Sequence, residues 1–181
     1  MSCRAVFLDR DGVINRAIVR DQKPFAPRDV AEVDILPRVP EALERLKAAG
    51  FVLIVVSNQP DVARGTTDRR TVEAINAKLA ERLPLDDFRV CYHDSRDACD
   101  CRKPKAGLLK AAARDRDVDL QASFLVGDRW RDIEAGLSVG CTTLFIDYGY
   151  DEPQPAVCDY RVKSLDEAAR IILSLDEIES S

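Results

Sequence analysis

The stretch AVFLDRDG, residues 5–12, decides how this chain is organised. Four apolar residues in a row are typical of a short strand that is buried on both faces of a parallel sheet. Asp9 and Asp11 follow two positions apart, so in extended backbone both carboxylates point the same way, and Gly12 then permits a turn. Two acids this close repel each other unless a cation lies between them. Taken alone, however, such a pair is more often two solvated acids at the end of a strand.

Short apolar runs recur along the chain and predict its fold class. Further buried strands are expected at residues 51–56, 88–91, 124–126 and 142–146. Helical patterns are expected around residues 39–46, 72–79, 108–112, 133–137 and 168–172. Strands that alternate with helices predict an α/β fold, a doubly wound, Rossmann-like parallel sheet in three layers. Residues 15–37 are expected to form a long loop and not a separate cap domain, so that residues 1–181 make a single domain.

Length, charge and hydropathy argue against several classes of protein. A chain of 181 residues fits one domain. Its net charge of -5 disfavours non-specific binding of nucleic acid, which requires a positive surface. No apolar run approaches the ~20 residues that cross a bilayer, and acidic residues follow Met1 too soon for a signal peptide. We therefore expect a cytoplasmic protein with no nucleic-acid or membrane partner, acting on a small molecule, and we expect a monomer because nothing in the pattern demands a partner surface.

Two polar segments follow the second and third predicted strands, where doubly wound sheets place their sites. The segment SNQP, residues 57–60, offers a hydroxyl and amides that can hold phosphoryl oxygens. By itself it is better interpreted as a polar loop that ends at a proline. The segment RKP, residues 102–104, offers two cations suited to a dianionic substrate. The plainer interpretation is an exposed basic pair at the start of a helix, although the helix dipole disfavours cations there.

An acid follows the fourth predicted strand as well. Asp128 can complete a metal site begun by Asp9 and Asp11, because the carboxyl ends of parallel strands meet at one edge of a sheet. It also suits the N-cap of the next helix, and Asp132 suits the first turn of that helix. Singly, the capping interpretation is favoured. Together with the hydroxyl and the lysine at the other strand ends, these acids predict phosphoryl transfer.

A cluster of metal-binding residue types lies after the third strand. It consists of Cys91, His93, Cys99 and Cys101, within eleven positions, and His93 is the only histidine. A lone cysteine is usually a buried filler and a lone histidine is usually a surface or core residue, but four together are hard to attribute to chance. Three thiolates and one imidazole make a complete tetrahedral zinc site, which is closed to substrate and therefore structural.

Four ordered segments resemble the motifs of the haloacid dehalogenase superfamily. They are FLDRDGVIN at 7–15, SNQ at 57–59, RKP at 102–104 and GD at 127–128. The loop of residues 91–101 is similar to that of a zinc-containing branch without a cap domain, which includes heptose bisphosphate phosphatases and histidinol-phosphate phosphatases. The resemblance implies a Mg²⁺-dependent phosphatase that acts through a phospho-aspartate.

The resemblance also implies a role for each matching residue. Asp9 would be the nucleophile and Asp11 the general acid/base, with Mg²⁺ bound by the Asp9 carboxylate, the Asp11 backbone carbonyl and Asp128. Ser57 and Lys103 would stabilise the phosphoryl group. The residues implied to bind the substrate are Asn58, Gln59, Pro60, Arg64, Arg102 and Arg129. The residues implied to bind a structural Zn²⁺ are Cys91, His93, Cys99 and Cys101.

Two features bear on the identity of the substrate. The segment ARG, residues 63–65, resembles the heptose enzymes, whereas the five-residue gap between His93 and Cys99 resembles the zinc loop of histidinol phosphatases. Because loops change length cheaply, we expect the 7-phosphate of D-glycero-D-manno-heptose 1,7-bisphosphate to be the substrate, with histidinol phosphate as the alternative. Residues 60–61 and Arg129 depart from the heptose pattern. A third interpretation, a non-catalytic zinc module that binds a partner, leaves the acids at the strand ends unexplained.

Overall fold

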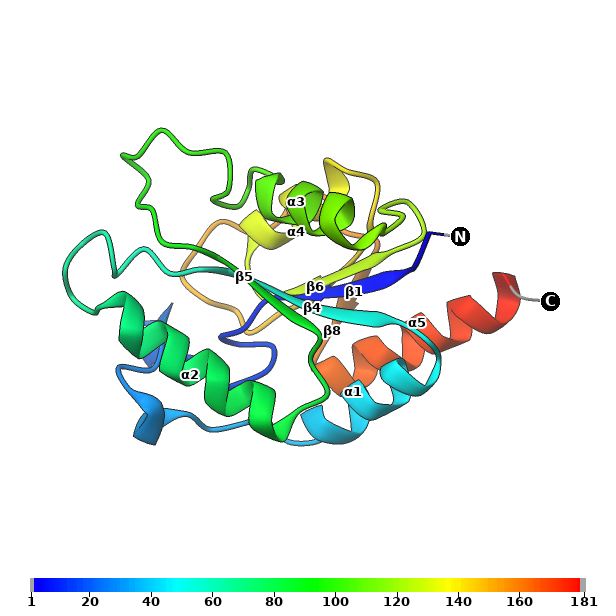
Figure 1. The fold of residues 1–181 in the computed structure, drawn as a ribbon, viewed down its shortest axis with the longest axis horizontal. Coiled ribbons are helices and arrows are strands. Elements are labelled where there is room, and N and C mark those ends of the chain that lie inside the picture. Colours follow the sequence, from blue (N-terminus) through cyan, green and yellow to red (C-terminus); the bar gives the residue numbers. More distant parts are fainter. Residues whose placement is uncertain (1, 180–181) are drawn as a thin grey trace.

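A computed structural model describes residues 2–179 and confirms the predicted parallel sheet (Figure 1). Six strands lie in the order β5-β4-β1-β6-β7-β8, and every neighbouring pair is parallel. The strands are β1 (Ala5–Leu8), β4 (Val52–Asn58), β5 (Asp87–Cys91), β6 (Phe124–Gly127), β7 (Thr142–Ile146) and β8 (Tyr160–Val162). All four residues of β1 are fully buried, because this strand lies inside the sheet between β4 and β6.

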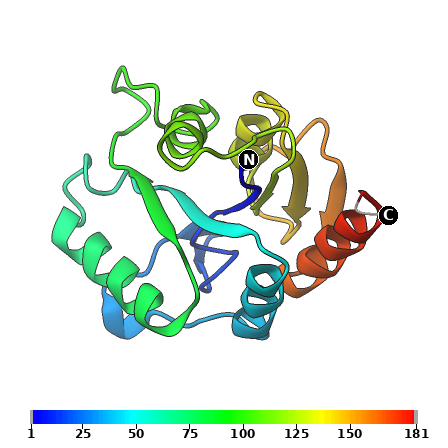
Figure 2. The same ribbon diagram turned by 45° about the vertical axis from the view of Figure 1, so that its right-hand side comes forward.

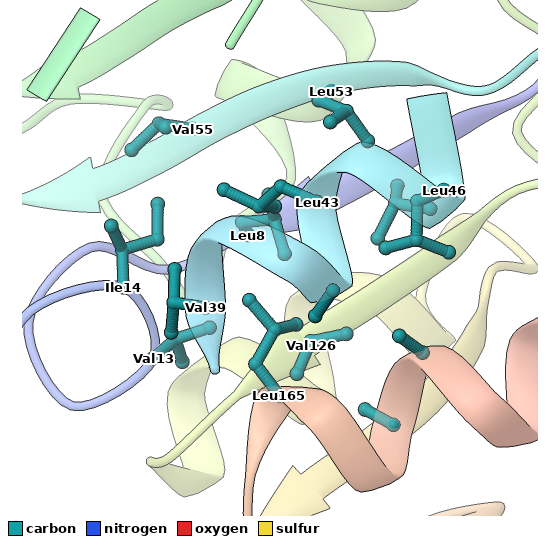
Figure 3. Close-up of a cluster of buried hydrophobic side chains, with 14 of the residues drawn as sticks. Leu8, Val13, Ile14, Val39, Leu43, Leu46, Leu53, Val55, Val126 and Leu165 are labelled. Atoms are coloured by element: carbon teal, nitrogen blue, oxygen red, sulfur yellow. The ribbon is translucent and has the colours of Figure 1, made fainter. Parts of the chain in front are cut away.

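Helices cover both faces of the sheet and make the three expected layers (Figures 1 and 2). The helices on one face are α3 (Gly107–Arg116) and α4 (Trp130–Leu137). The helices on the other are α1 (Val39–Ala48), α2 (Arg69–Arg82) and α5 (Leu165–Glu179). Figure 3 shows how Leu43 and Leu46 of α1 pack beside Leu8 and Val55 of the sheet. Each such buried side chain contributes about 1.5–3 kcal/mol, so the apolar faces hold the layers together.

The register of the sheet aligns the polar residues that follow the carboxyl ends of neighbouring strands. Leu8, the last residue of β1, pairs with Val55 on one side and with Val126 on the other. The candidate site residues begin one or two positions beyond these partners. They are Asp9, Ser57 and Asp128. The parallel pairing therefore places all three at the same carboxyl edge.

The segment 15–37 is more regular than the expected loop. Its strands β2 (Ile18–Arg20) and β3 (Lys23–Phe25) form an antiparallel hairpin, and a short 3-10 turn, η1 (Val30–Glu32), follows. Both residues at the tip of the hairpin adopt positive φ, as a tight two-residue turn requires. The expected long loop therefore contains a hairpin that the sequence did not reveal, because strands of three residues are too short to show a pattern of alternation.

Two further details of the fold bear on the predictions. Strand β4 continues to Asn58, two residues beyond its expected end, so Ser57 and Asn58 belong to the strand itself. β8 was not predicted, since it has only three residues.

Among residues 2–179, no helix is long and apolar enough to cross a membrane.

Candidate active site and metal centres

Three buried carboxylates meet at the carboxyl ends of β1 and β6. Asp9, Asp128 and Asp132 each offer an oxygen, and these oxygens lie within 4.8 Å of one another. All three are buried, since the exposed fraction is 8% for Asp9 and 2% for each of Asp128 and Asp132. Burial, together with repulsion by Asp132, raises the pKa of Asp9 to about 6. Burial and the two neighbouring carboxylates likewise raise the pKa of Asp128 well above its usual range.

Two glycines allow the carboxylates to approach this closely. Gly12 has a φ of +89°, and a Cβ atom there would lie 2.0 Å from Asp128 Oδ2. A Cβ atom on Gly127 would lie 2.2 Å from the Cβ atom of Asp132. Such distances are far below van der Waals contact, so a side chain at either position would displace an acid from the cluster.

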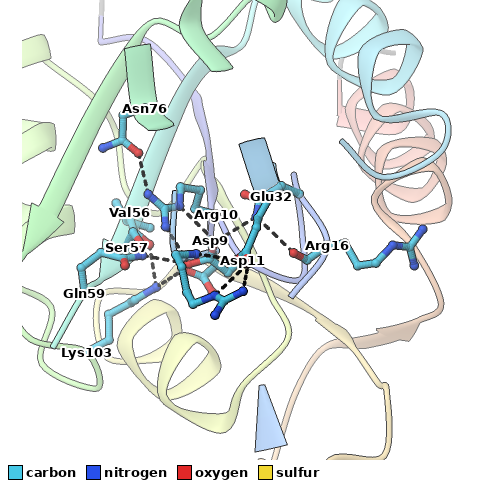
Figure 4. Close-up of polar contacts among 12 residues, drawn as sticks. Asp9, Arg10, Asp11, Arg16, Glu32, Val56, Ser57, Gln59, Asn76 and Lys103 are labelled. Carbon is cyan, nitrogen blue, oxygen red and sulfur yellow. Dashed lines mark hydrogen bonds and ion pairs between the residues drawn. The ribbon is translucent and has the colours of Figure 1, made fainter. Parts of the chain in front are cut away.

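The ammonium group of Lys103 is buried against two of the three acids, Asp9 and Asp132, and Figure 4 shows its contact with Asp9. Its Nζ atom donates to Asp9 Oδ1 at 2.9 Å and to the Val56 carbonyl at 2.6 Å, and it lies 2.6 Å from Asp132 Oδ1. Burial opposes the charged form, but the attraction of Asp132 and Asp9 outweighs burial and raises the pKa of Lys103. The lysine therefore stays protonated beside the expected nucleophile.

The donor set fits a divalent cation in addition to Lys103. One ammonium cannot balance three ionised carboxylates, and both Asp128 oxygens are buried without a hydrogen-bond partner. Buried polar atoms in folded proteins nearly always have partners, so two orphaned oxygens indicate that something else binds there. Mg²⁺ takes oxygen ligands of this kind. Asp9 and Asp128, whose side chains were expected to hold Mg²⁺, are thus brought together.

The carboxylate of Asp11 is held by amide groups beside this cluster. Asn15 Nδ2 donates to Asp11 Oδ1 at 2.9 Å, and Gln59 Nε2 donates to Asp11 Oδ2 at 2.8 Å. Gln59 Nε2 also lies 2.9 Å from Ser57 Oγ. One amide group therefore links the expected general acid/base to the hydroxyl expected to bind the phosphoryl group.

Asn58 fixes the backbone of the basic segment. Its Nδ2 donates to the Lys103 carbonyl at 3.0 Å, and its Oδ1 accepts from the Lys103 N–H at 3.1 Å. Arg102 donates from Nη1 to the His93 carbonyl at 3.1 Å. The end of β4 and the zinc loop therefore hold the basic segment from two sides, and helix α3 begins only at Gly107. The basic pair is not the exposed start of a helix.

The acid cluster opens into a cavity of about 240 Å³. All six residues expected to bind the substrate line it, namely Asn58, Gln59, Pro60, Arg64, Arg102 and Arg129. Arg64 is paired with Asp94 and Arg129 with Glu152, so these two guanidinium groups already have counter-ions. Residues 23–26 of the β2–β3 hairpin form part of the wall, which the sequence did not reveal because the hairpin was not predicted.

The second candidate metal centre is the cysteine and histidine cluster after β5. Cys91 Sγ lies 3.1 Å from Cys101 Sγ and 3.9 Å from Cys99 Sγ, and His93 Nδ1 lies 3.2 Å from Cys101 Sγ. All four ligand atoms lie within 4.8 Å of one another. This spacing is compatible with a tetrahedral Zn²⁺ site, whose bonds are about 2.0–2.3 Å long. Burial and the adjacent Cys101 thiol raise the pKa of Cys91 to about 12, so a bound metal would be needed to deprotonate it.

Asp132 is the site residue that the sequence did not assign. Its Oδ2 accepts from the Arg129 N–H at 3.1 Å, as expected of an acid in the first turn of α4, while its Oδ1 contacts Lys103. The N-cap of α4 is Arg129 and not Asp128, so the capping interpretation of Asp128 was wrong. One carboxylate thus serves both the helix and the site, and a capping pattern alone cannot distinguish the two roles.

Comparisons with known proteins agree with this geometry. A family model described as HAD-hydrolase-like matches residues 100–168. The D-glycero-beta-D-manno-heptose-1,7-bisphosphate 7-phosphatase of Pseudomonas aeruginosa is 36% identical over 154 residues, which cover 82% of this chain and 84% of the relative. The enzyme of the same name from Escherichia coli K12 is 34% identical over 156 residues, which cover 78% of each chain.

A solved structure is similar over nearly the whole chain. It is a D,D-heptose 1,7-bisphosphate phosphatase from B. bronchiseptica, complexed with magnesium and phosphate, which is 30% identical with a TM-score of 0.80. The match covers 95% of this chain and 99% of the other. Since relatives above 30% identity match most of its length, this chain belongs to the phosphatases of the haloacid dehalogenase superfamily, in the family that contains the D-glycero-D-manno-heptose 1,7-bisphosphate 7-phosphatases.

Proposed function

We propose that this chain hydrolyses the 7-phosphate of D-glycero-D-manno-heptose 1,7-bisphosphate in the presence of Mg²⁺, with Asp9 as the nucleophile. The observation that carries the proposal is the contact between Lys103 Nζ and Asp9 Oδ1 at 2.9 Å, beside the unpartnered carboxylate of Asp128. A carboxylate flanked by a fixed cation and by metal ligands, and open to a cavity, is equipped to attack the phosphorus atom of an anionic ester. The names of the relatives support the choice of substrate.

The arrangement supports two half-reactions. In the first, an Asp9 oxygen bonds to phosphorus, the bond between phosphorus and the sugar oxygen breaks, and Asp11 gives that oxygen a proton. In the second, water attacks the aspartyl phosphate, Asp11 takes the proton from the water, and the Asp9 carboxylate and phosphate are released. Ser57 and Lys103 hold the phosphoryl oxygens throughout. Mg²⁺, when bound, supplies further positive charge to these oxygens.

Cations at the cavity support a substrate with a second anionic group. Among residues 2–179, no ion pair is found for Lys23, Arg102 or Arg131, and all three line the cavity. The Arg131 guanidinium lies 4.5 Å from the centre of the Trp130 ring, and its pKa is lowered by burial and by the neighbouring cations Arg129 and Arg102. A second phosphate would offset this repulsion. Histidinol phosphate instead brings an amine cation to the same surface, so the surface favours the bisphosphate.

We further propose that the chain acts as a single-domain monomer in the cytoplasm, without a nucleic-acid or membrane partner. One continuous sheet with helices on both faces supports the single domain. All six cysteines are free of disulfides, which suits a reducing compartment. Size-exclusion chromatography with light scattering tests the oligomeric state.

Phosphate release by the purified protein with Mg²⁺ tests the proposed substrate. We expect a higher kcat/KM for the heptose bisphosphate than for histidinol phosphate, and no release by Asp9→Asn. We expect Arg131→Gln to lower kcat/KM for the bisphosphate more than for a minimal aryl phosphate. The matched control is Arg170→Gln, which removes an exposed guanidinium from α5. A higher kcat/KM for histidinol phosphate would overturn the choice of substrate, and binding of zinc without turnover of any phosphate ester would favour a non-catalytic zinc module.

A further inference from the structure

Arg10, between the two acids of the first motif, is fully buried although it carries a charge. Its guanidinium turns toward the general acid/base, with Nε 3.1 Å from Asp11 Oδ1 and Nη2 3.1 Å from Asp11 Oδ2. This is a two-point contact, in which the planar guanidinium fixes both the position and the tilt of the carboxylate.

With Arg10 included, the carboxylate of Asp11 accepts from four donors. Each oxygen accepts once from Arg10 and once from an amide, that of Asn15 or that of Gln59. An ionised carboxylate offers about four acceptor sites, so all of them are used here, and one of the four contacts must open when Asp11 carries the proton that it transfers. The orientation of the group that must reach the departing oxygen is therefore set by these partners.

The third contact of Arg10 leads away from the site to helix α2. Nη1 donates to Asn76 Oδ1 at 2.9 Å, and Asn76 is 8% exposed (Figure 4). The other inward positions of α2 are apolar, namely Val72, Ile75 and Leu79. A buried amide among apolar neighbours is costly unless it is hydrogen-bonded, and for Asn76 the bond to Arg10 supplies that partner. The helix thus provides a fixed point for the guanidinium.

We propose that Asn76 is a positioning residue for the general acid/base, because it anchors Arg10, which in turn orients the carboxylate of Asp11. This inference rests on the proposed phosphatase function but is independent of the identity of the sugar. The hydrogen bond of Asn76 leads to Arg10 and not to the carboxylates of Asp9 or Asp128, so we expect its effect to reach the site through Arg10 and Asp11.

Proton transfer by Asp11 matters to different degrees for different esters. An alkoxide from a sugar phosphate is a poor leaving group and needs a proton as it departs. The p-nitrophenolate anion departs without one. Because kcat/KM reports the steps up to the departure of the alcohol, a misplaced Asp11 lowers kcat/KM for the alkyl ester and spares the aryl ester. A general loss of structure would lower both.

The test is Asn76→Ala, assayed with an alkyl phosphate that the wild type hydrolyses and with p-nitrophenyl phosphate. Positioned proton transfer contributes about 10²–10⁴-fold, so we expect loss of the anchor to lower kcat/KM for the alkyl ester by roughly tenfold. We expect a change below about twofold for the aryl ester. Asn76→Asp retains an acceptor for Arg10 and should restore most of the alkyl activity. If Asn76→Ala does not fold, Asn76→Ser, whose hydroxyl is too short to reach Arg10, takes its place.

The matched control is Ile75→Val, which removes one methylene group from a buried position on the same helix. It should lower stability by about 0.5–1.5 kcal/mol and leave the ratio of the two kcat/KM values unchanged. Equal losses on both esters in Asn76→Ala, or no recovery in Asn76→Asp, would overturn the positioning role. A wild-type protein that hydrolyses no phosphate ester at all would instead overturn the proposed function itself, so the two failures are distinguishable.

Discussion

Replacing Asp9 with asparagine tests the metal site through stability, without any need for turnover. In protein free of Mg²⁺, Asp9 lies buried among two other carboxylates, and its pKa rises from 3.8 to about 6. Between these two pH values the folded state binds more protons than the unfolded chain does. Stability must therefore fall as the pH rises through this window, and the loss is complete above the folded-state pKa.

The size of the effect follows from the shift. One pKa unit corresponds to about 1.4 kcal/mol. The rise from 3.8 to about 6 therefore means that ionised Asp9 costs the Mg²⁺-free fold on the order of 3 kcal/mol at pH 7. Asparagine carries no charge and removes this cost. We expect Asp9→Asn to be more stable than the wild type by up to about 3 kcal/mol at pH 7, and by about half as much at pH 5.

Urea unfolding followed by circular dichroism measures this difference. Dialysis against Mg²⁺-free buffer is preferable to a chelator, because it leaves the zinc site intact. The control is Asp21→Asn, an exposed acid at the tip of the β2–β3 hairpin, which should change stability little. Adding Mg²⁺ should then stabilise the wild type and not Asp9→Asn, because ligands stabilise only the folds that bind them. Equal unfolding midpoints without Mg²⁺ at pH 7, or a less stable variant, would refute the crowding of carboxylates described above.

Three other substitutions give sharp outcomes. Asp11→Asn should slow both the formation and the breakdown of the phospho-aspartate by about 100-fold or more in rapid-quench assays, and an effect on breakdown alone would contradict its double role. Cys99→Ser should lower the zinc content, the Tm and kcat together, whereas unchanged kinetics would show that the zinc loop does not support the site. Gly12→Ala should abolish phosphate release by displacing Asp128, while Gly50→Ala, at a similar φ of +86° with nothing within 4 Å, should cost about 1 kcal/mol and remain active. Activity in Gly12→Ala would show that the close approach is not required.

The sheet and the carboxyl-edge site were predictable because strong local patterns coincide with the global fold. The runs AVFL at 5–8 and TTLFI at 142–146 form β1 and β7 with the expected bounds. Parallel pairing then fixed which strand ends meet, so the positions of Asp9 and Asp128 followed from order alone. Such inference works where burial, period and topology agree.

The elements that were missed lack a local pattern. The β2–β3 hairpin depends on a two-residue turn and on packing against the rest of the chain, and its strands are too short for periodicity to show. In the sequence, Asn76 cannot be distinguished from an ordinary polar residue of a helix, because no neighbouring residue indicates that its side chain accepts a hydrogen bond from Arg10. Both assignments depend on contacts between residues far apart in the chain, which a single sequence does not display.

The short distance along the chain between Cys101 and Lys103 has a consequence for the cell. Arg102, between them, donates to the His93 carbonyl, so a Zn²⁺ ion bound by the four ligands would help to set where Lys103 lies beside Asp9. We therefore expect the enzyme to depend on two separate nutrients: magnesium for each turnover, and zinc once, when the chain folds. Under zinc starvation, newly made protein would then be inactive even where magnesium is plentiful, whereas protein made earlier would remain active.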